Sequence, residues 1–153
     1  MPDLITTLGK ILIIIFSIIL HEVAHGAMAK HLGDDTADRE GRLTLNPLPH
    51  IDLFGTILLP LMTLSRGWGI FGYAKPVPYN PFNVRGRYGE LKIALAGPAT
   101  NLLIAAAFAV AMRAGYAGMF PLSDVLIKLL MYGVSINIWL ALFNLVPIPP
   151  LDG

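Results

Sequence analysis

Residues 18–33 read IILHEVAHGAMAKHLG, and this stretch decides how the rest of the chain is interpreted. The apolar run ILIIIFSIIL (11–20) ends there, and His21, Glu22 and His25 follow at once. On a helix, residues four apart share a face, so the two imidazoles should project from one side. Ionisable side chains inside a membrane span are costly and are functional by default. The pattern therefore predicts a functional site within a membrane helix.

The composition of the chain also favours a membrane protein. Of its 153 residues, 55% are hydrophobic and only 14% are charged. Soluble domains usually carry about 25% charged residues. The chain has no cysteine, which excludes disulfides and thiolate metal sites. A net charge of +1 excludes a generic nucleic-acid-binding surface.

Three stretches are long enough to cross a bilayer as helices, namely 4 to about 30, 91–112 and 125–146. Each supplies about 20 residues at a rise of about 1.5 Å, which matches the hydrocarbon core. We therefore expect an all-α integral membrane protein with three full transmembrane helices, built as a single core over residues 1–153.

Two other segments are harder to place. The stretch IDLFGTILLPLMTLS (51–65) is apolar but short, and it is interrupted by a glycine and a proline. We expect it to be re-entrant or interfacial. Residues 66–90 are rich in glycine, proline and aromatic side chains. They could form a membrane-dipping β-hairpin whose edge, with Phe71 and Tyr73, pairs with an unwound substrate. An ordinary loop explains this composition equally well.

His21, Glu22 and His25 match the pattern H-E-x-x-H, in which two imidazoles bind one zinc ion and the glutamate acts as general base toward water. A histidine pair that is merely packed is the alternative, and the apolar surroundings favour the metal. Catalytic zinc needs a third protein ligand. His31 has metzincin-like spacing, but Met28 stands where that pattern has glycine. His31 should therefore lie at the interface, at the helix end.

Asp152 follows the third predicted span and the segment PIPP (147–150), whose stiff path could carry the carboxylate to a fixed point. Asn137 and Asn144 are seven residues apart and share a helix face. For Asn137 we favour an interhelical hydrogen bond. For Asn144 we favour a role in holding substrate or stabilising an oxyanion. Asn101 could have either a structural role between helices or a role in the site.

Two groups of polar residues in the connections are expected to have no catalytic role. The acidic side chains at 34, 35, 38 and 40 fall in a charged, turn-rich segment and should be solvated. His50 and Asp52 form an H-x-D pair, for which a turn with local hydrogen bonds is a better explanation than a second metal site.

Three motifs in this order resemble the site-2 protease family of intramembrane zinc metalloproteases: HEVAH (21–25), GPATN (97–101) and NLVPIPPLDG (144–153). The stretches GRLTLNPLPHID (41–52) and GYAKPVPYNP (72–81) look like its compact branch, which lacks a PDZ domain. Members usually continue past Leu-Asp-Gly with more helix, so the resemblance implies that the chain is truncated at its C-terminus.

The resemblance also implies roles for individual residues. Zinc would be the cofactor, with Glu22 as the catalytic base and with three ligands, His21, His25 and Asp152. Asn144 would lie near the zinc, and Asn101 would lie on the motif of the middle core helix.

We therefore interpret the chain as a zinc-dependent intramembrane endopeptidase. It would hydrolyse peptide bonds in or near the transmembrane segments of membrane protein substrates, within a lipid bilayer and without nucleic acid. The alternative is a metal-binding membrane transporter or a catalytically inactive homologue. Such a protein would use the same ligands but would not need Glu22 as a base.

The positions of the predicted ligands also predict the topology. His21 lies toward the far end of the first span, and Asp152 follows the third span. These two helices should therefore run the same way, the middle helix should run back, and 51–65 should enter and leave on one side. That side collects most basic residues, which makes it cytoplasmic by the positive-inside rule. We expect a prokaryotic plasma membrane, with the active site toward the cytoplasm.

Overall fold

The computed structural model describes residues 4–52, 55, 58, 62, 65 and 75–146. Its long helices are α1 (Leu4–His31), α4 (Gly89–Tyr116) and α5 (Asp124–Asn144). Each of the three is long enough and apolar enough to cross a membrane, judged by length and composition. The three predicted spans are therefore confirmed as helices.

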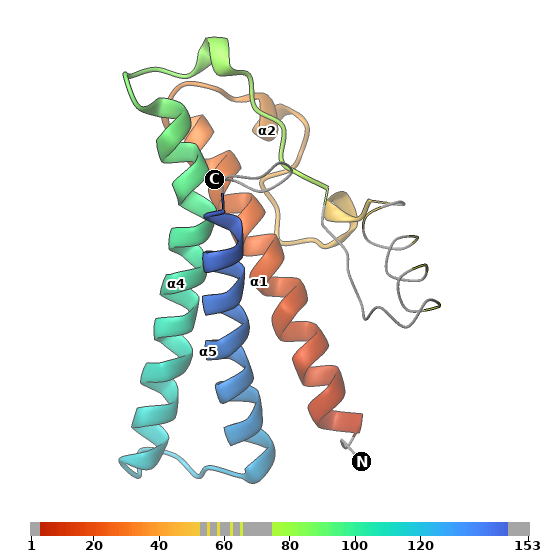
Figure 1. Ribbon diagram of the computed structural model, residues 1–153, viewed down its shortest axis with the longest axis vertical. Helices are drawn as coiled ribbons and strands as arrows, with labels where there is room; N and C mark the ends of the chain where they lie inside the picture. Colours follow the sequence, from red (N-terminus) through yellow and green to blue (C-terminus); the bar gives the residue numbers. More distant parts are fainter. Residues whose placement is uncertain are drawn as a thin grey trace.

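The three helices pack against one another in pairs (Figure 1). The helices α1 and α5 run in the same direction and α4 runs back between their ends, as the positions of the predicted ligands required. The short turn between α4 and α5 explains the antiparallel pair. Gly118 adopts a φ of 82° just after α4, and Ser123 caps α5 by accepting a hydrogen bond from Leu126 N at 3.2 Å.

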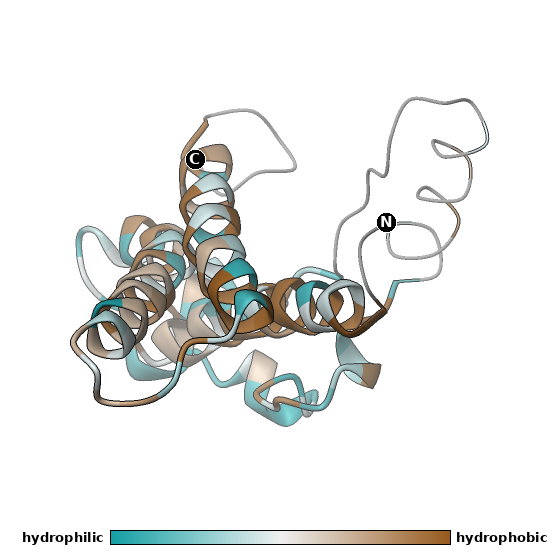
Figure 2. Ribbon diagram, turned by 90° about the horizontal axis from the view of Figure 1, so that it is seen from below, coloured by the Kyte–Doolittle hydropathy of each residue, from teal (hydrophilic) through white to brown (hydrophobic). Residues whose placement is uncertain are grey.

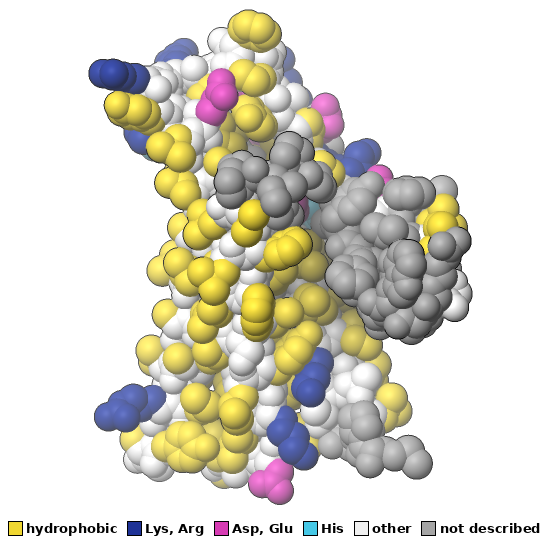
Figure 3. Space-filling view, in the orientation of Figure 1, with side chains coloured by type: hydrophobic (Ala, Val, Ile, Leu, Met, Phe, Trp, Pro, Cys, Tyr) yellow, Lys and Arg dark blue, Asp and Glu magenta, His cyan; other side chains and the backbone are white. Residues whose placement is uncertain are grey.

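The outer faces of the bundle are apolar. Leu103, Val110 and Trp139 are among the large side chains that remain exposed there. Hydrophobic residues recur along all three helices, whereas the described connections between α1 and α4 are more hydrophilic (Figure 2). In Figure 3 the charged side chains gather near the two ends of the bundle, with a largely apolar surface between them. A surface of this kind is typical of a protein that lies in a bilayer.

The centre of the bundle is partly polar. Asn137 is fully buried, and its Nδ2 donates to Ser17 Oγ on α1 and to Gly133 O in its own helix, each at 2.9 Å. The interhelical hydrogen bond predicted for Asn137 is therefore confirmed. Such contacts join helices that hydrophobic burial alone cannot hold together in lipid.

Short helices lie in the described parts of the connections. They are α2 (Thr36–Arg39) and two 3₁₀ helices, η1 (Leu48–His50) and η3 (Pro81–Asn83). His50 Nε2 bonds to Thr44 O at 2.9 Å, and Asp52 Oδ1 accepts from Gly55 N at 2.6 Å. The local-turn explanation of the H-x-D pair is therefore confirmed.

The expected β-hairpin is not found in the described part of the 66–90 segment. Residues 75–80 are extended without forming a strand, and no strand occurs elsewhere in the residues that the structure describes. Phe71, Tyr73 and most of 51–65 lie outside the described residues. Lys75 N donates to His50 O at 3.0 Å, so the described chain resumes beside the point at which η1 ends.

Candidate metal centre

His21 and His25 lie on the inward face of α1 and are only 5% and 9% exposed. Their ring centroids are 4.7 Å apart, with the ring planes at 80°. The two Nε2 atoms are 3.1 Å apart. The shared helix face predicted from the spacing therefore brings two imidazole nitrogens to one point within the bundle.

Both imidazoles are held from behind by α4. His21 Nδ1 bonds to Asn101 Oδ1 at 2.8 Å, and His25 Nδ1 bonds to Ile93 O at 2.7 Å. A carbonyl oxygen can only accept, so the hydrogen on each ring belongs at Nδ1. In the neutral rings both Nε2 atoms then carry lone pairs, which face each other. Their geometry would let both nitrogens bind one cation.

This arrangement fits zinc. In a tetrahedral site with Zn–N bonds of about 2.0–2.1 Å, two nitrogen ligands stand about 3.3 Å apart. The observed separation of 3.1 Å is close to that value. Metal-binding histidines commonly donate their other N–H to a carbonyl or carboxylate oxygen, which fixes the ring and the tautomer. Asn101 and Ile93 supply such acceptors here.

Gly97 of α4 explains how the helices come close enough. A Cβ atom added there would lie 2.6 Å from Cε1 and Nε2 of His21 and would overlap Nε2 of His25. No side chain fits at this position. The glycine thus lets α4 approach α1 closely, and the same contact encloses the histidine pair.

Glu22 faces a different neighbour. Its half-buried carboxylate accepts a hydrogen bond through Oε2 from the backbone N–H of Val77, at 3.0 Å. The carboxylate therefore lies against the extended segment that precedes η3. No pattern of side chains in the sequence could have revealed this contact, because its donor is a backbone amide.

Of the four remaining predicted site residues, the structure describes only Asn144. Asn144 ends α5 and donates to Leu140 O of its own helix at 3.0 Å. Asp152, Phe71 and Tyr73 lie outside the described residues. His31 is exposed at the last residue of α1, so the prediction that it lies at the helix end is confirmed. No cluster of three His, Cys, Asp or Glu side chains occurs within the ranges that the structure describes.

Sequence reasoning left one residue open and misjudged another. Asn101 lies four residues after Gly97 on the same face of α4, and its contact with His21 now gives it a role in positioning that ring. Asp34 was expected to be solvated, and that expectation is wrong. The residue is fully buried because Asn80 and Asn83, from a later part of the chain, bond to its carboxylate.

Comparison with known proteins gives relatives with a consistent name. The chain is 42% identical to "Putative zinc metalloprotease YwhC" of Bacillus subtilis, over the whole chain and 66% of that protein. It is 31% identical to "Putative zinc metalloprotease Rip2" of Mycolicibacterium smegmatis, over 91% of the chain and 52% of that protein. A shorter match, 44% over 62 residues, is to "Putative zinc metalloprotease MJ0611" of Methanocaldococcus jannaschii.

The chain thus spans about two thirds or less of the length of these relatives. No family model and no solved structure matches it. The relatives' shared name agrees with the motifs HEVAH, GPATN and NLVPIPPLDG and with the histidine pair that α4 encloses. The chain belongs to the site-2 protease-like family of zinc metalloproteases.

Proposed function

We propose that the protein is a zinc-dependent intramembrane endopeptidase that cleaves membrane protein substrates in or near their transmembrane segments. One observation carries the proposal: two buried Nε2 atoms face each other at 3.1 Å, with both Nδ1 atoms bound to acceptors. This pair lies within an apolar helix, with Glu22 beside it. The names of the relatives support the metal and the reaction class.

We assign the zinc ligands as His21 and His25, through Nε2, together with Asp152. The helix α5 runs in the same direction as α1 but ends short of it, so the chain after Asn144 starts in the half of the bundle where α1 finishes (Figure 1). A carboxylate is a suitable third ligand, because catalytic zinc sites combine histidine with Asp or Glu and keep one position open.

Zinc bound at this centre would act as a Lewis acid that acidifies a water molecule and polarises the peptide carbonyl. Glu22 would take a proton from the attacking water and give it to the amine nitrogen as the peptide bond breaks. The Val77 N–H holds Oε2 of this carboxylate and so orients it. Asn101 and Ile93 keep the two imidazole rings in place during the reaction.

The substrate would arrive as a transmembrane helix and must unwind locally to expose a peptide bond. We propose that Asn144, Phe71 and Tyr73 contact the unwound segment. The same proposal includes a hairpin edge within 66–90 that pairs with the unwound segment and a re-entrant or interfacial placement of 51–65.

The site would open toward the cytoplasm. The end of the bundle where α1 finishes and α4 begins carries more basic residues than the other end: Lys30, Arg39, Arg42, Lys75, Arg85, Arg87 and Lys92 against Lys10, Arg113 and Lys128. Single cysteines at 36 and 85 should be labelled from the cytoplasmic side, and one at 118 from the opposite side. Labelling of 36 and 85 from opposite sides would contradict this orientation.

Cleavage of a model transmembrane substrate by the purified protein in bilayers tests the function. Activity should disappear with a zinc chelator and return with added zinc. A protein that binds zinc but leaves the substrate intact would be an inactive homologue. If it also moved zinc across sealed vesicles, it would be a transporter.

A further inference from the structure

The segment 75–83, which we call the strap, consists of the stretch 75–80 followed by η3 and runs beside the last turns of α1. Its backbone amides bond to three separate parts of the molecule. Lys75 N donates to His50 O at 3.0 Å, and Val77 N donates to Glu22 Oε2 at 3.0 Å. Asn80 N donates to Asp34 Oδ2 at 2.8 Å. The strap therefore connects the carboxylate of the proposed base to the loops that follow α1.

Arg42 fixes the strap next to its contact with Glu22. Its guanidinium Nη2 donates to Lys75 O at 2.6 Å and to Pro76 O at 3.3 Å. The residue is only 4% exposed, and no acidic side chain among the described residues pairs with it. A buried cation is costly unless its hydrogen bonds are satisfied. The Nη2 contacts that offset part of this cost go to the strap.

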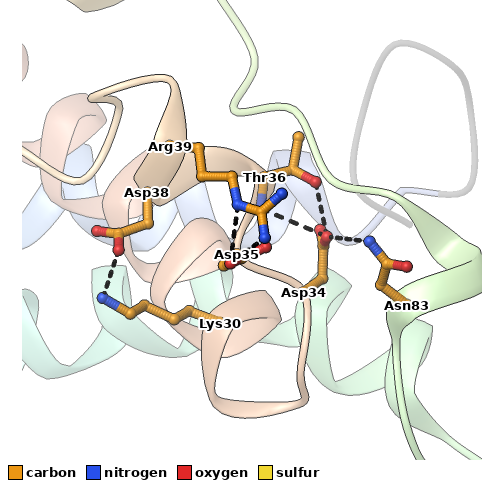
Figure 4. A network of polar contacts seen from close by, with 7 residues as sticks. All are labelled: Lys30, Asp34, Asp35, Thr36, Asp38, Arg39 and Asn83. Carbon is orange, nitrogen blue, oxygen red and sulfur yellow. Dashed lines mark hydrogen bonds and ion pairs between the residues drawn. The ribbon is translucent and has the colours of Figure 1, made fainter.

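Arg39, three residues earlier, shows what an ordinary arginine does in this region. Its side chain is 78% exposed and pairs with Asp35 at 2.8 Å (Figure 4). A surface pair of this kind contributes little to stability. The two arginines are therefore a matched pair: one on the surface, and one buried against the backbone that holds the base.

The other end of the strap is held by Asp34. Its carboxylate accepts from Asn80 N and from Asn83 Nδ2, the latter at 3.0 Å, and also from Thr36 Oγ1 at 2.6 Å (Figure 4). Arg42 and Asp34 thus anchor the strap on either side of Val77. The carboxylate of Asp34 acts at the far end, and the guanidinium of Arg42 acts one residue away from the amide that reaches Glu22.

The sequence of the strap makes this amide distinctive. Pro76 and Pro78 flank Val77 and have no N–H, and both restrict the backbone to an extended path. The side chain of Val77 is buried against α1, since a Cβ atom on Gly26 would lie 2.8 Å from its Cγ1. Movement of the backbone at 75–76 would therefore be transmitted to the Val77 N–H.

We propose that Arg42 is a positioning residue for the catalytic base: by holding the carbonyls of Lys75 and Pro76, it fixes the Val77 N–H on the Glu22 carboxylate. The catalytic consequence rests on the proposed function, whereas the structural role of Arg42 does not. The test accordingly has an activity arm and an arm that needs no activity.

In the activity arm, Arg42→Gln should lower kcat about 10- to 100-fold, because misplacement of a catalytic group by about 1 Å has effects of this size. KM and zinc content should change little. Arg39→Gln, the matched control, should leave both constants unchanged. In Arg42→Ala, added methylguanidinium should restore part of kcat, while methylammonium at the same concentration should not.

The second arm measures hydrogen–deuterium exchange in the same proteins, resolved to single amides. Between 75 and 80 only Lys75, Val77, Tyr79 and Asn80 carry an N–H. In Arg42→Gln the amides of Lys75 and Val77 should exchange faster. The amide of Asn80 should stay protected by Asp34, and Arg39→Gln should match the wild type throughout.

Unchanged exchange at Val77 in Arg42→Gln, or wild-type kcat in that variant, would overturn the proposal. If Arg42→Gln does not fold, Val77→Pro decides the question by removing the donor itself within an already extended proline-rich path. Wild-type kcat in Val77→Pro would equally overturn it. If the wild-type protein cleaves no substrate at all, the proposed function fails, while the exchange arm still decides whether Arg42 holds the strap.

Discussion

The histidine pair and Glu22 are neighbours in the sequence, but different parts of the fold hold them. His21 and His25 are fixed by Asn101 and Ile93 of α4, across a helix interface that Gly97 makes close. Glu22 is instead held by the Val77 amide of the strap. The metal-binding side of the site thus depends on helix packing, whereas the base depends on hydrogen bonds made by loops. The two sides should therefore respond differently to mutation.

Glu22→Gln should show the largest difference between the two sides, with a loss of cleavage but no loss of zinc. This change keeps the size of the side chain but removes its basicity, so cleavage should fall by at least about 10²–10⁴-fold. Zinc content should remain, because Glu22 is not one of the proposed ligands. Turnover assays and metal analysis on the same preparation measure both effects. Near-normal turnover would rule out Glu22 as the base.

Asp152→Ala should affect the metal side instead. Removal of one of three protein ligands should lower zinc occupancy and, with it, activity. His31→Ala is the control, because His31 is exposed at the end of α1 and should matter for neither. The opposite pattern in metal analysis would identify His31 as the ligand.

The two buried asparagines sharpen the comparison within the bundle. Asn101→Ala should weaken zinc affinity about 10- to 100-fold, the usual effect of losing a partner that orients a metal-bound histidine. Asn137→Ala should lower thermal stability by breaking the bond to Ser17, yet leave zinc affinity close to normal. Competition with a chromogenic chelator measures the affinities. Equal affinities in both variants would remove Asn101 from the metal centre.

The smallest effect concerns the strap and should depend on pH. Burial by itself raises the pKa of Asp34, but hydrogen bonds from Thr36, Asn80 and Asn83 outweigh it and hold the pKa below the ordinary value of 3.8. A lowered pKa stabilises the fold above that value, and the stabilisation is lost as the pH falls further. The thermal stability of the wild type, measured by its unfolding temperature, should therefore decrease below about pH 3.8.

Asp34→Asn tests the origin of that acid sensitivity. The variant should be slightly less stable near neutral pH, because the amide is a weaker acceptor than the carboxylate. It should also lack the contribution that Asp34 makes to the acid-induced loss. Identical pH profiles for the variant and the wild type would show that Asp34 does not anchor the strap through its charge.

The same comparison shows what the sequence could predict. The three spans and the shared face of His21 and His25 follow from apolar length and helical spacing, which are local properties of one segment. The partner of His21 is 80 residues away on another helix, so Asn101 remained ambiguous. The Val77 amide that reaches Glu22 has no side-chain signature at all. Asp34 seemed solvated because its partners come from a segment far along the chain.

The central claim is that the Nε2 atoms of His21 and His25 share one zinc ion. Zinc K-edge X-ray absorption of the purified protein tests it most directly, because imidazole ligands have a characteristic scattering pattern. The account predicts one zinc per chain with two imidazole nitrogens at about 2.0–2.1 Å and oxygen ligands in the remaining positions. The His21→Ala variant should lose one imidazole from this pattern or lose the metal. A zinc environment without imidazole, or an identical spectrum in His21→Ala, would contradict the assignment.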